Sequence, residues 1–180
     1  MFMPTREERI VNLKKANDES HRNVVTSLKD ALYGLLKKKD IKDITVTELI
    51  RTAGVSRGVF YKYYYLVSDV LLEDIRELSQ MVNTNIGDDL HQNWLVIFRT
   101  SYDNREKISL LLKANMGKEL LKQLNHFADE HKGYEDIMRM WYGIIFNAIV
   151  TWSERDFRET PEEYAAIYTK MSSPIFKFND

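Results

Sequence analysis

The apolar residues of this chain recur with a period close to 3.6 along almost all of its 180 residues. No stretch shows the sustained two-residue alternation that is typical of a half-buried strand. Seven glycines and three prolines are few breaks for a chain of 180 residues, and this scarcity favours long helices over many turns. The sequence therefore predicts an all-α protein.

The expected helices follow from these apolar stripes and from capping residues. Residues 1–19 are polar and mixed in charge, and we expect them to form an N-terminal extension before a helix of about residues 20–38. The last helix has a clear start, because Thr160 can cap it and Pro161 suits its first position. Between these, helices are expected at about residues 46–53, 57–63, 67–84, 88–102 and 134–153.

The composition argues against several classes of protein. The chain has no cysteine, which removes disulfides, thiolate nucleophiles and cysteine-based zinc sites. It shows no glycine-rich phosphate loop and no set of nucleophile, base and orienting residue, so we expect no enzyme, no cofactor and no metal. Its N-terminus lacks the apolar core of a signal peptide, and its longest apolar stretch is too short to cross a bilayer. We expect a cytoplasmic protein without a membrane partner.

Charge is distributed unevenly along the chain. The net charge is −1, but seven basic residues face three acidic ones between Lys37 and Lys62. From residue 81 onward, twelve basic residues face fifteen acidic ones. Positive charge is therefore concentrated in a short N-terminal segment, where a phosphate backbone could use it.

The same segment carries the most informative motif of the chain. Thr45 and Glu48 form a capping box, which starts a helix at Val46. Gly54 supplies a sharp turn, and Ser56 caps a second short helix. A short helix, a turn containing glycine and a second short helix are the plan of a helix-turn-helix motif.

The second helix of the motif has two different sides. Phe60 and Tyr64 are four residues apart and share the inward side. The outward side then holds Arg57, Gly58, Tyr61, Lys62 and Tyr63. A cation, a bare glycine, two phenols and a lysine suit entry into a major groove, because they can reach base edges and phosphates while the backbone comes close.

Over about residues 20–75 the chain resembles the DNA-binding domain of the TetR family of bacterial regulators. The matching residues are Thr45, Val46, Ile50, Ala53, Gly54, Val55, Ser56, Gly58, Phe60, Tyr61, Tyr63, Tyr64 and Asp69 to Leu72. The resemblance implies an N-terminal three-helix helix-turn-helix domain (residues 20–66) joined to a C-terminal helical bundle for regulation and dimerisation (residues 67–180). It also implies a homodimer that binds a near-palindromic DNA operator, most commonly as a repressor.

The resemblance assigns roles to seven residues of the motif. By position, Thr45, Ser56, Tyr61 and Tyr63 match residues that contact phosphates. Arg57, Gly58 and Lys62 match residues that face the groove. One departure follows the motif, where Leu66 and Val67 replace the usual small cap and phosphate-reaching lysine. This departure favours an alternative hypothesis, a co-regulator on the same scaffold that acts through protein contacts with DNA binding weakened or lost.

The C-terminal aromatic residues have two interpretations. Aromatic residues at helical spacing commonly form a core, but they can also line a pocket for a small apolar effector. The candidate pocket residues are Trp94, Phe98, Tyr102, Trp141 and Phe146. A protein partner is the alternative ligand of this domain. A small-molecule carrier is a third function class, and it would leave the basic helix of the motif unexplained.

The helices of about residues 134–153 and 161–173 are the candidate dimer interface. The first of them is apolar on more than one side, whereas a helix with a single buried side needs one stripe. We therefore expect one side to pack on its own domain and the other on a partner copy. The candidate interface residues are Ile145, Ile149, Trp152, Tyr164, Ile167, Tyr168 and Met171.

Overall fold

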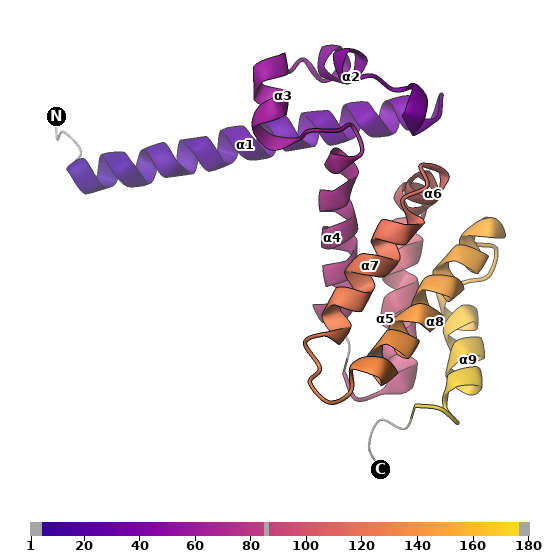
Figure 1. Ribbon diagram of the computed structural model, residues 1–180. Coiled ribbons are helices and arrows are strands. Elements are labelled where there is room, and N and C mark those ends of the chain that lie inside the picture. The colour runs from indigo at the N-terminus through magenta and orange to yellow at the C-terminus, as the bar shows by residue number, and fades with distance from the viewer. Residues whose placement is uncertain (1–4, 85–86, 177–180) are drawn as a thin grey trace. The chain divides into compact units, whose positions relative to one another are not determined.

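The computed structural model describes residues 5–84 and 87–176, and within them the chain forms nine α-helices, one short 3-10 helix and no strand (Figure 1). This confirms the predicted all-α class. The chain divides into two compact units between Leu71 and Leu72. The division lies five residues beyond the boundary expected from the sequence. No helix in the described part of the chain is both long and apolar enough to cross a membrane.

The first unit is built on one long helix. It contains α1 (Arg6–Leu36), the 3-10 helix η1 (Ile41–Asp43), α2 (Val46–Ala53) and α3 (Arg57–Tyr63). The expected start of the first helix near residue 20 is wrong, because residues 6–19 of the polar segment are already helical. Thr5 explains the earlier start: its side chain accepts a hydrogen bond from the Glu8 backbone N–H at 3.2 Å, and the Glu8 carboxylate accepts one from the Thr5 backbone N–H at 2.7 Å.

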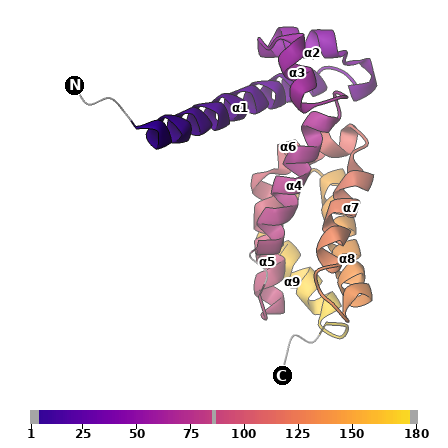
Figure 2. The ribbon, with the colours of Figure 1, turned by 60° about the vertical axis from the view of Figure 1, so that its left-hand side comes forward.

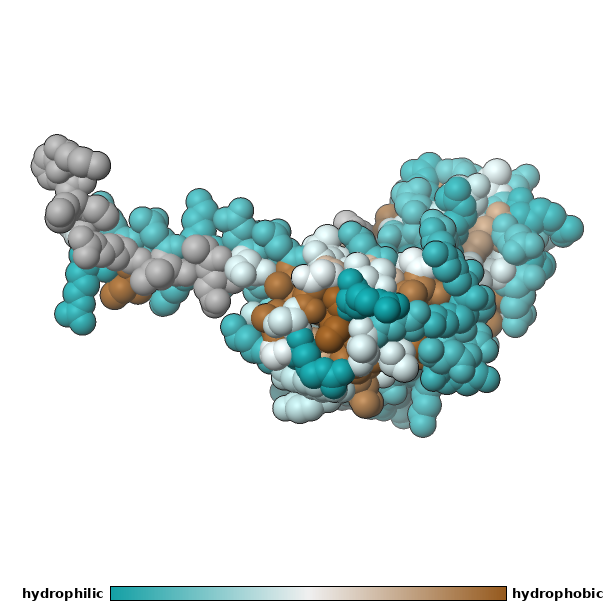
Figure 3. Space-filling view, turned by 90° about the horizontal axis from the view of Figure 1, so that it is seen from above, coloured by the Kyte–Doolittle hydropathy of each residue, from teal (hydrophilic) through white to brown (hydrophobic). Residues whose placement is uncertain are grey.

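The core of the first unit lies between the C-terminal half of α1 and the two short helices, which cover that half in Figure 1. Leu28 and Leu32 of α1 are fully buried, as are Leu49 of α2 and Phe60 of α3. The N-terminal part of α1 extends past this core, and its surface is mainly hydrophilic in Figure 3. Burial of the two short helices therefore depends on one end of α1.

The second unit is a helical bundle. It takes most of α4 (Asp69–Thr84) and all of the later helices, which are α5 (Leu90–Asp103), α6 (Arg105–Lys113), α7 (Gly117–Ala128), α8 (Glu135–Glu154) and α9 (Pro161–Ser172). Figures 1 and 2 show α5 beside α9 and α7 beside α8. The last helix starts where the sequence predicts, because Thr160 and Glu163 form a complete capping box and Pro161 occupies the first turn.

An aromatic cluster forms the centre of this bundle. Trp94 and Phe98 of α5 stack with ring centroids 5.3 Å apart, and Trp94 lies 4.6 Å from Trp141 of α8. Trp152 stacks on Tyr164 at 4.8 Å, which joins α8 to α9. Such close contacts use the faces and edges of the rings against each other. The cluster therefore fills the space between α5, α8 and α9.

This packing corrects the predicted effector pocket. Trp94, Phe98 and Trp141 are at most 1% exposed and interlock as core, so they do not surround a cavity. Tyr102 and Phe146 are half-buried, and Tyr102 lies 5.9 Å from the Trp152 ring. A cavity of about 30 Å³ lies elsewhere in the bundle, between aliphatic residues such as Leu78, Leu111 and Ile145. It has room for little more than a water molecule.

The predicted dimer interface also needs a correction. Ile145, Ile149, Trp152 and Tyr164 are at most 6% exposed, because they pack inside the helical bundle of the second unit. Tyr168 is half-buried against Trp94 and Phe98. Ile167 and Met171 of α9 are exposed, and so are Ile137 and Met140 at the start of α8. The apolar period showed that α8 has two apolar sides, but it could not show which one faces the core.

A buried hydrogen bond between α5 and α9 gives a test of this packing. The Trp94 indole N–H donates to the Ser172 hydroxyl at 2.8 Å, and both residues are at most 3% exposed. Ser172→Ala leaves the indole N–H buried without an acceptor, so we expect the free energy of unfolding to fall by about 1–3 kcal/mol. Urea denaturation followed by tryptophan fluorescence measures this loss, because all three tryptophans belong to the second unit.

The exposed neighbour Ser173 is the matched control. Ser173→Ala removes the same atoms from the surface and should change the free energy of unfolding by less than about 0.5 kcal/mol. Equal effects of the two substitutions would contradict the stabilising role of the buried hydrogen bond.

Candidate nucleic-acid interface

The helices α2 and α3 are joined by a turn whose shape depends on Gly54. Gly54 ends α2 with φ +67°, in the left-handed region, and its N–H returns to the carbonyl groups of α2. The Val55 N–H also donates to the Ile50 carbonyl, at 3.0 Å. Side-chain caps fix both helix starts: Thr45 accepts from the Glu48 N–H at 3.2 Å, and Ser56 accepts from the Val59 N–H at 3.3 Å. The bounds of α2 and α3 match the helices that the sequence predicts.

The two sides of α3 differ as predicted except at Tyr63, which was expected on the outward side and is half-buried. Phe60 is fully buried and Tyr64 is 8% exposed, so both belong to the core. On the opposite side Arg57, Gly58 and Lys62 are exposed, and Tyr61 is 45% exposed. We call these four residues the outer face of α3. The structure thus places a cation, a bare backbone, a phenol and a second cation on one short helix.

Hydrogen bonds and ion pairs decide which cations near this face are available. Arg57 donates from Nη2 to the Thr47 hydroxyl at 2.6 Å, so α2 holds its guanidinium in place. The guanidinium keeps further N–H groups for another acceptor. Lys39 forms an ion pair with Glu48 at 2.6 Å, which ties the turn after α1 to α2. Arg57 and Lys62 are therefore the cations of the outer face, whereas Lys39 has a structural partner.

Three of the predicted phosphate-contacting residues have structural roles as well. The hydroxyls of Thr45 and Ser56 accept hydrogen bonds as helix caps, which leaves their O–H groups to donate elsewhere. Tyr63 is half-buried, and its ring centroid lies 4.4 Å from that of His21 in α1. The Lys62 ammonium lies 5.0 Å from the centre of the same ring. Sequence reasoning missed the contact with His21, because no local pattern shows which residue of α1 meets α3.

The segment after α3 presents an uncharged surface. Tyr65 is 82% exposed and Leu66 is 62% exposed. The Asp69 carboxylate accepts hydrogen bonds from their backbone N–H groups, at 3.0 and 2.8 Å, and so fixes this turn. The position of the expected lysine is taken by Val67, which is half-buried. This segment therefore adds no positive charge to the outer face of α3.

Known proteins give a limited comparison. The chain is similar to a protein named "Uncharacterized HTH-type transcriptional regulator YxbF" from Bacillus subtilis (strain 168), with 42% identity over 53 residues. The matched region is 28% of this chain and only 14% of that protein. No family profile and no solved structure matches the chain. The likeness is thus partial, and it agrees with the helix-turn-helix geometry of α2 and α3.

Two glycines of the motif make a stability test. Gly54→Ala forces an L side chain into the left-handed region, so we expect the first unit to lose about 1–2 kcal/mol of stability. Gly58→Ala adds a methyl group in open space on α3, and we expect stability to stay equal or to rise by up to about 1 kcal/mol. Denaturation followed by far-UV circular dichroism measures both changes. A Gly54→Ala variant as stable as the parent would contradict the left-handed turn.

Proposed function

We propose that this protein is a sequence-specific DNA-binding transcriptional regulator of the TetR type that acts by binding and not by catalysis. It binds a near-palindromic operator as a homodimer and represses transcription. The outer face of α3 carries this proposal, because it combines Arg57, Gly58, Tyr61 and Lys62 on a capped and anchored helix. The partial likeness to a protein named as an HTH-type transcriptional regulator supports it.

Each residue of the outer face has a chemical task in this proposal. Arg57, steadied by Thr47, donates to guanine edges, which accept two hydrogen bonds in the major groove. Gly58 has no side chain and lets the backbone of α3 approach the bases. Lys62 also faces the groove, and Tyr61 donates to a phosphate on its flank. Phosphate contacts set the position of the helix, and base contacts give specificity.

The uncharged segment after α3 supports a second candidate function. A co-regulator that works through protein contacts would need no phosphate-binding lysine there, and exposed Tyr65 and Leu66 suit a protein partner. Arg57 and Lys62, the two exposed cations of α3, favour DNA instead, because a co-regulator that binds only proteins would not need positive charge on this helix. Binding to DNA fragments separates these candidates directly.

The DNA-binding test starts from fragments selected by the purified protein out of a random pool. We expect a near-palindromic consensus and an affinity that falls steeply with salt, because phosphate contacts release counterions. Arg57→Ala should cost about 1–3 kcal/mol and relax specificity at one position of each half-site. Tyr61→Phe should weaken selected and random DNA alike. Fluorescence anisotropy with both kinds of DNA measures these effects.

Arg158 supplies a matched control, because it is exposed on the second unit. Arg158→Ala should leave both affinities unchanged. If selected and random DNA bind equally at every salt concentration, sequence-specific recognition is ruled out. If no DNA binds at all, the co-regulator becomes the better proposal.

The proposed homodimer uses the exposed apolar residues of α8 and α9. Ile137 and Met140 of α8 are 51% and 45% exposed, and Ile167 and Met171 of α9 are 46% and 64% exposed. Exposed apolar surface of this kind marks an interaction site where it forms a contiguous patch. Pairing of these helices with their copies would build a four-helix interface about a two-fold axis.

A charge placed on this surface tests the dimer. Ile167→Asp should give a monomer, because the carboxylate would be buried without a partner in the interface. Operator affinity should then fall, since one half-site contributes much less binding than two. Sedimentation velocity at micromolar concentration measures the oligomeric state. Val11→Asp, at an exposed apolar residue of α1, is the control and should remain a dimer. A monomeric parent protein would contradict the proposal.

A further inference from the structure

Thr47 of α2 meets Arg57 of α3 across the turn that joins the two helices. The Thr47 hydroxyl accepts a hydrogen bond from Nη2 of Arg57 at 2.6 Å, and both residues are exposed. Ten positions separate them in the sequence, so the spacing along one helix does not predict this contact. Thr47 is not among the residues that the motif assigns to DNA binding. The structure nevertheless places its hydroxyl beside the outer face of α3.

The hydroxyl of Thr47 is an acceptor on a well-anchored helix. Leu49 of α2 is fully buried, and Glu48 forms the ion pair with Lys39 at 2.6 Å. Phe60, also fully buried, anchors α3 in the same core. A threonine side chain is branched at Cβ and adopts few rotamers in a helix. The position of the acceptor relative to the start of α3 is therefore restricted.

The second cation of the outer face is held differently. The Lys62 ammonium lies 5.0 Å from the centre of the Tyr63 ring, and it forms no hydrogen bond or ion pair with residues in the described part of the chain. Arg57, by contrast, has a hydrogen bond that restricts its long side chain. A guanine edge accepts two hydrogen bonds only from donors in a defined direction. Arg57 is therefore the cation of this face that is suited to reading a base.

The chemistry of the acceptor leaves Arg57 able to bind DNA. Glu48 is the acidic residue of α2, and Lys39 engages its carboxylate, whereas Arg57 contacts a neutral hydroxyl. A guanidinium has five N–H groups, so four remain after Thr47 has accepted one of them. Two of these are enough for a guanine. Thr47 thus orients the guanidinium without neutralising its charge.

We propose that Thr47 is a positioning residue that holds Arg57 in the direction needed to read one base pair of each half-site. This inference rests on the proposed function, in which Arg57 donates to guanine. The sequence specificity of α3 then depends on a hydroxyl group of α2. Phosphate contacts contribute to the binding of any sequence, so loss of this hydroxyl should reduce discrimination between sequences and spare the affinity for random DNA.

Three substitutions on α2 test this role. Thr47→Val removes the hydroxyl and keeps the branched shape, and Thr47→Ser keeps the hydroxyl. Thr52→Val is the matched control, because Thr52 is exposed on the same helix and its hydroxyl donates to the Glu48 carbonyl at 2.9 Å instead. Fluorescence anisotropy measures discrimination as the Kd for DNA with one base pair replaced, divided by the Kd for selected DNA. The base pair used is the one at which Arg57→Ala abolishes discrimination.

Thr47→Val should lower this ratio by roughly three- to tenfold, which is the effect of one lost hydrogen bond. Thr47→Ser and Thr52→Val should keep the ratio of the parent protein. When Arg57→Ala is already present, Thr47→Val should have no further effect, because the two residues act as one unit. The proposal is overturned if Thr47→Val discriminates as well as the parent. It is also overturned if Thr47→Val weakens binding equally with and without Arg57.

A measurement on the free protein separates this inference from the proposed function. The rotation of the Arg57 guanidinium, followed by ¹⁵N NMR, should be slower in the parent and in Thr47→Ser than in Thr47→Val. Equal rotation in the parent and in Thr47→Val would show that the hydroxyl does not hold Arg57, and the positioning role would fail while DNA binding stands. A parent protein that binds neither selected nor random DNA would refute the proposed function and the positioning role together.

Discussion

The left-handed turn at Gly54 is the constraint on which the candidate DNA-binding surface depends. With φ at +67° the chain reverses within two residues, so that Ser56 can cap α3 directly after α2 ends. Phe60, buried without exposed surface, then fixes the rotation of α3 about its own axis. Because Phe60 holds the inner side of α3 in the core, Arg57, Gly58 and Lys62 face outward. A single backbone conformation and a single buried ring thus determine what the helix presents.

Polar contacts hold the helices of the helix-turn-helix motif in place and leave the charges of Arg57 and Lys62 exposed. The ion pair of Lys39 with Glu48 connects the turn after α1 to α2, and the hydrogen bond from Arg57 to Thr47 connects α3 to α2. Both lie near the surface, where an ion pair contributes little free energy, so their main effect is on orientation. An arginine whose rotamers are already restricted loses less entropy when it binds. The first unit is therefore well organised for contact with an ordered, negatively charged partner.

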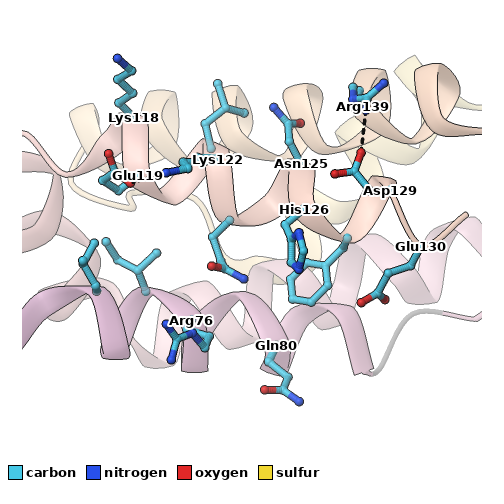
Figure 4. A pocket seen from close by; sticks show the side chains of 15 residues that line it. Arg76, Gln80, Lys118, Glu119, Lys122, Asn125, His126, Asp129, Glu130 and Arg139 are labelled. Carbon is cyan, nitrogen blue, oxygen red and sulfur yellow. Dashed lines mark hydrogen bonds and ion pairs between the residues drawn. The ribbon is translucent and has the colours of Figure 1, made fainter. Parts of the chain in front are cut away.

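In the second unit, packing places in the core the aromatic residues that the sequence suggested for a ligand pocket. Its largest aromatic side chains interlock between α5, α8 and α9, because burial of a tryptophan or tyrosine removes a large apolar area from water. A groove of about 950 Å³ lies where the residues are less bulky and more polar, between α4 and α7 (Figure 4). The exposed apolar pairs on α8 and α9 lie outside this aromatic core.

The local features of this protein could be read from the sequence, because short-range interactions determine them. Thr45, Gly54 and Ser56 set the ends of α2 and α3 through contacts within a few residues, and the apolar period predicted the all-α class. The contact of His21 with Tyr63, the partner of Arg57 and the burial of Ile149 depend on helices that meet only after folding. A helical period gives the angle between two side chains on one helix, but it does not say which neighbour each will meet. That choice was made by the tertiary structure, through the competition of the apolar faces of each unit for its core.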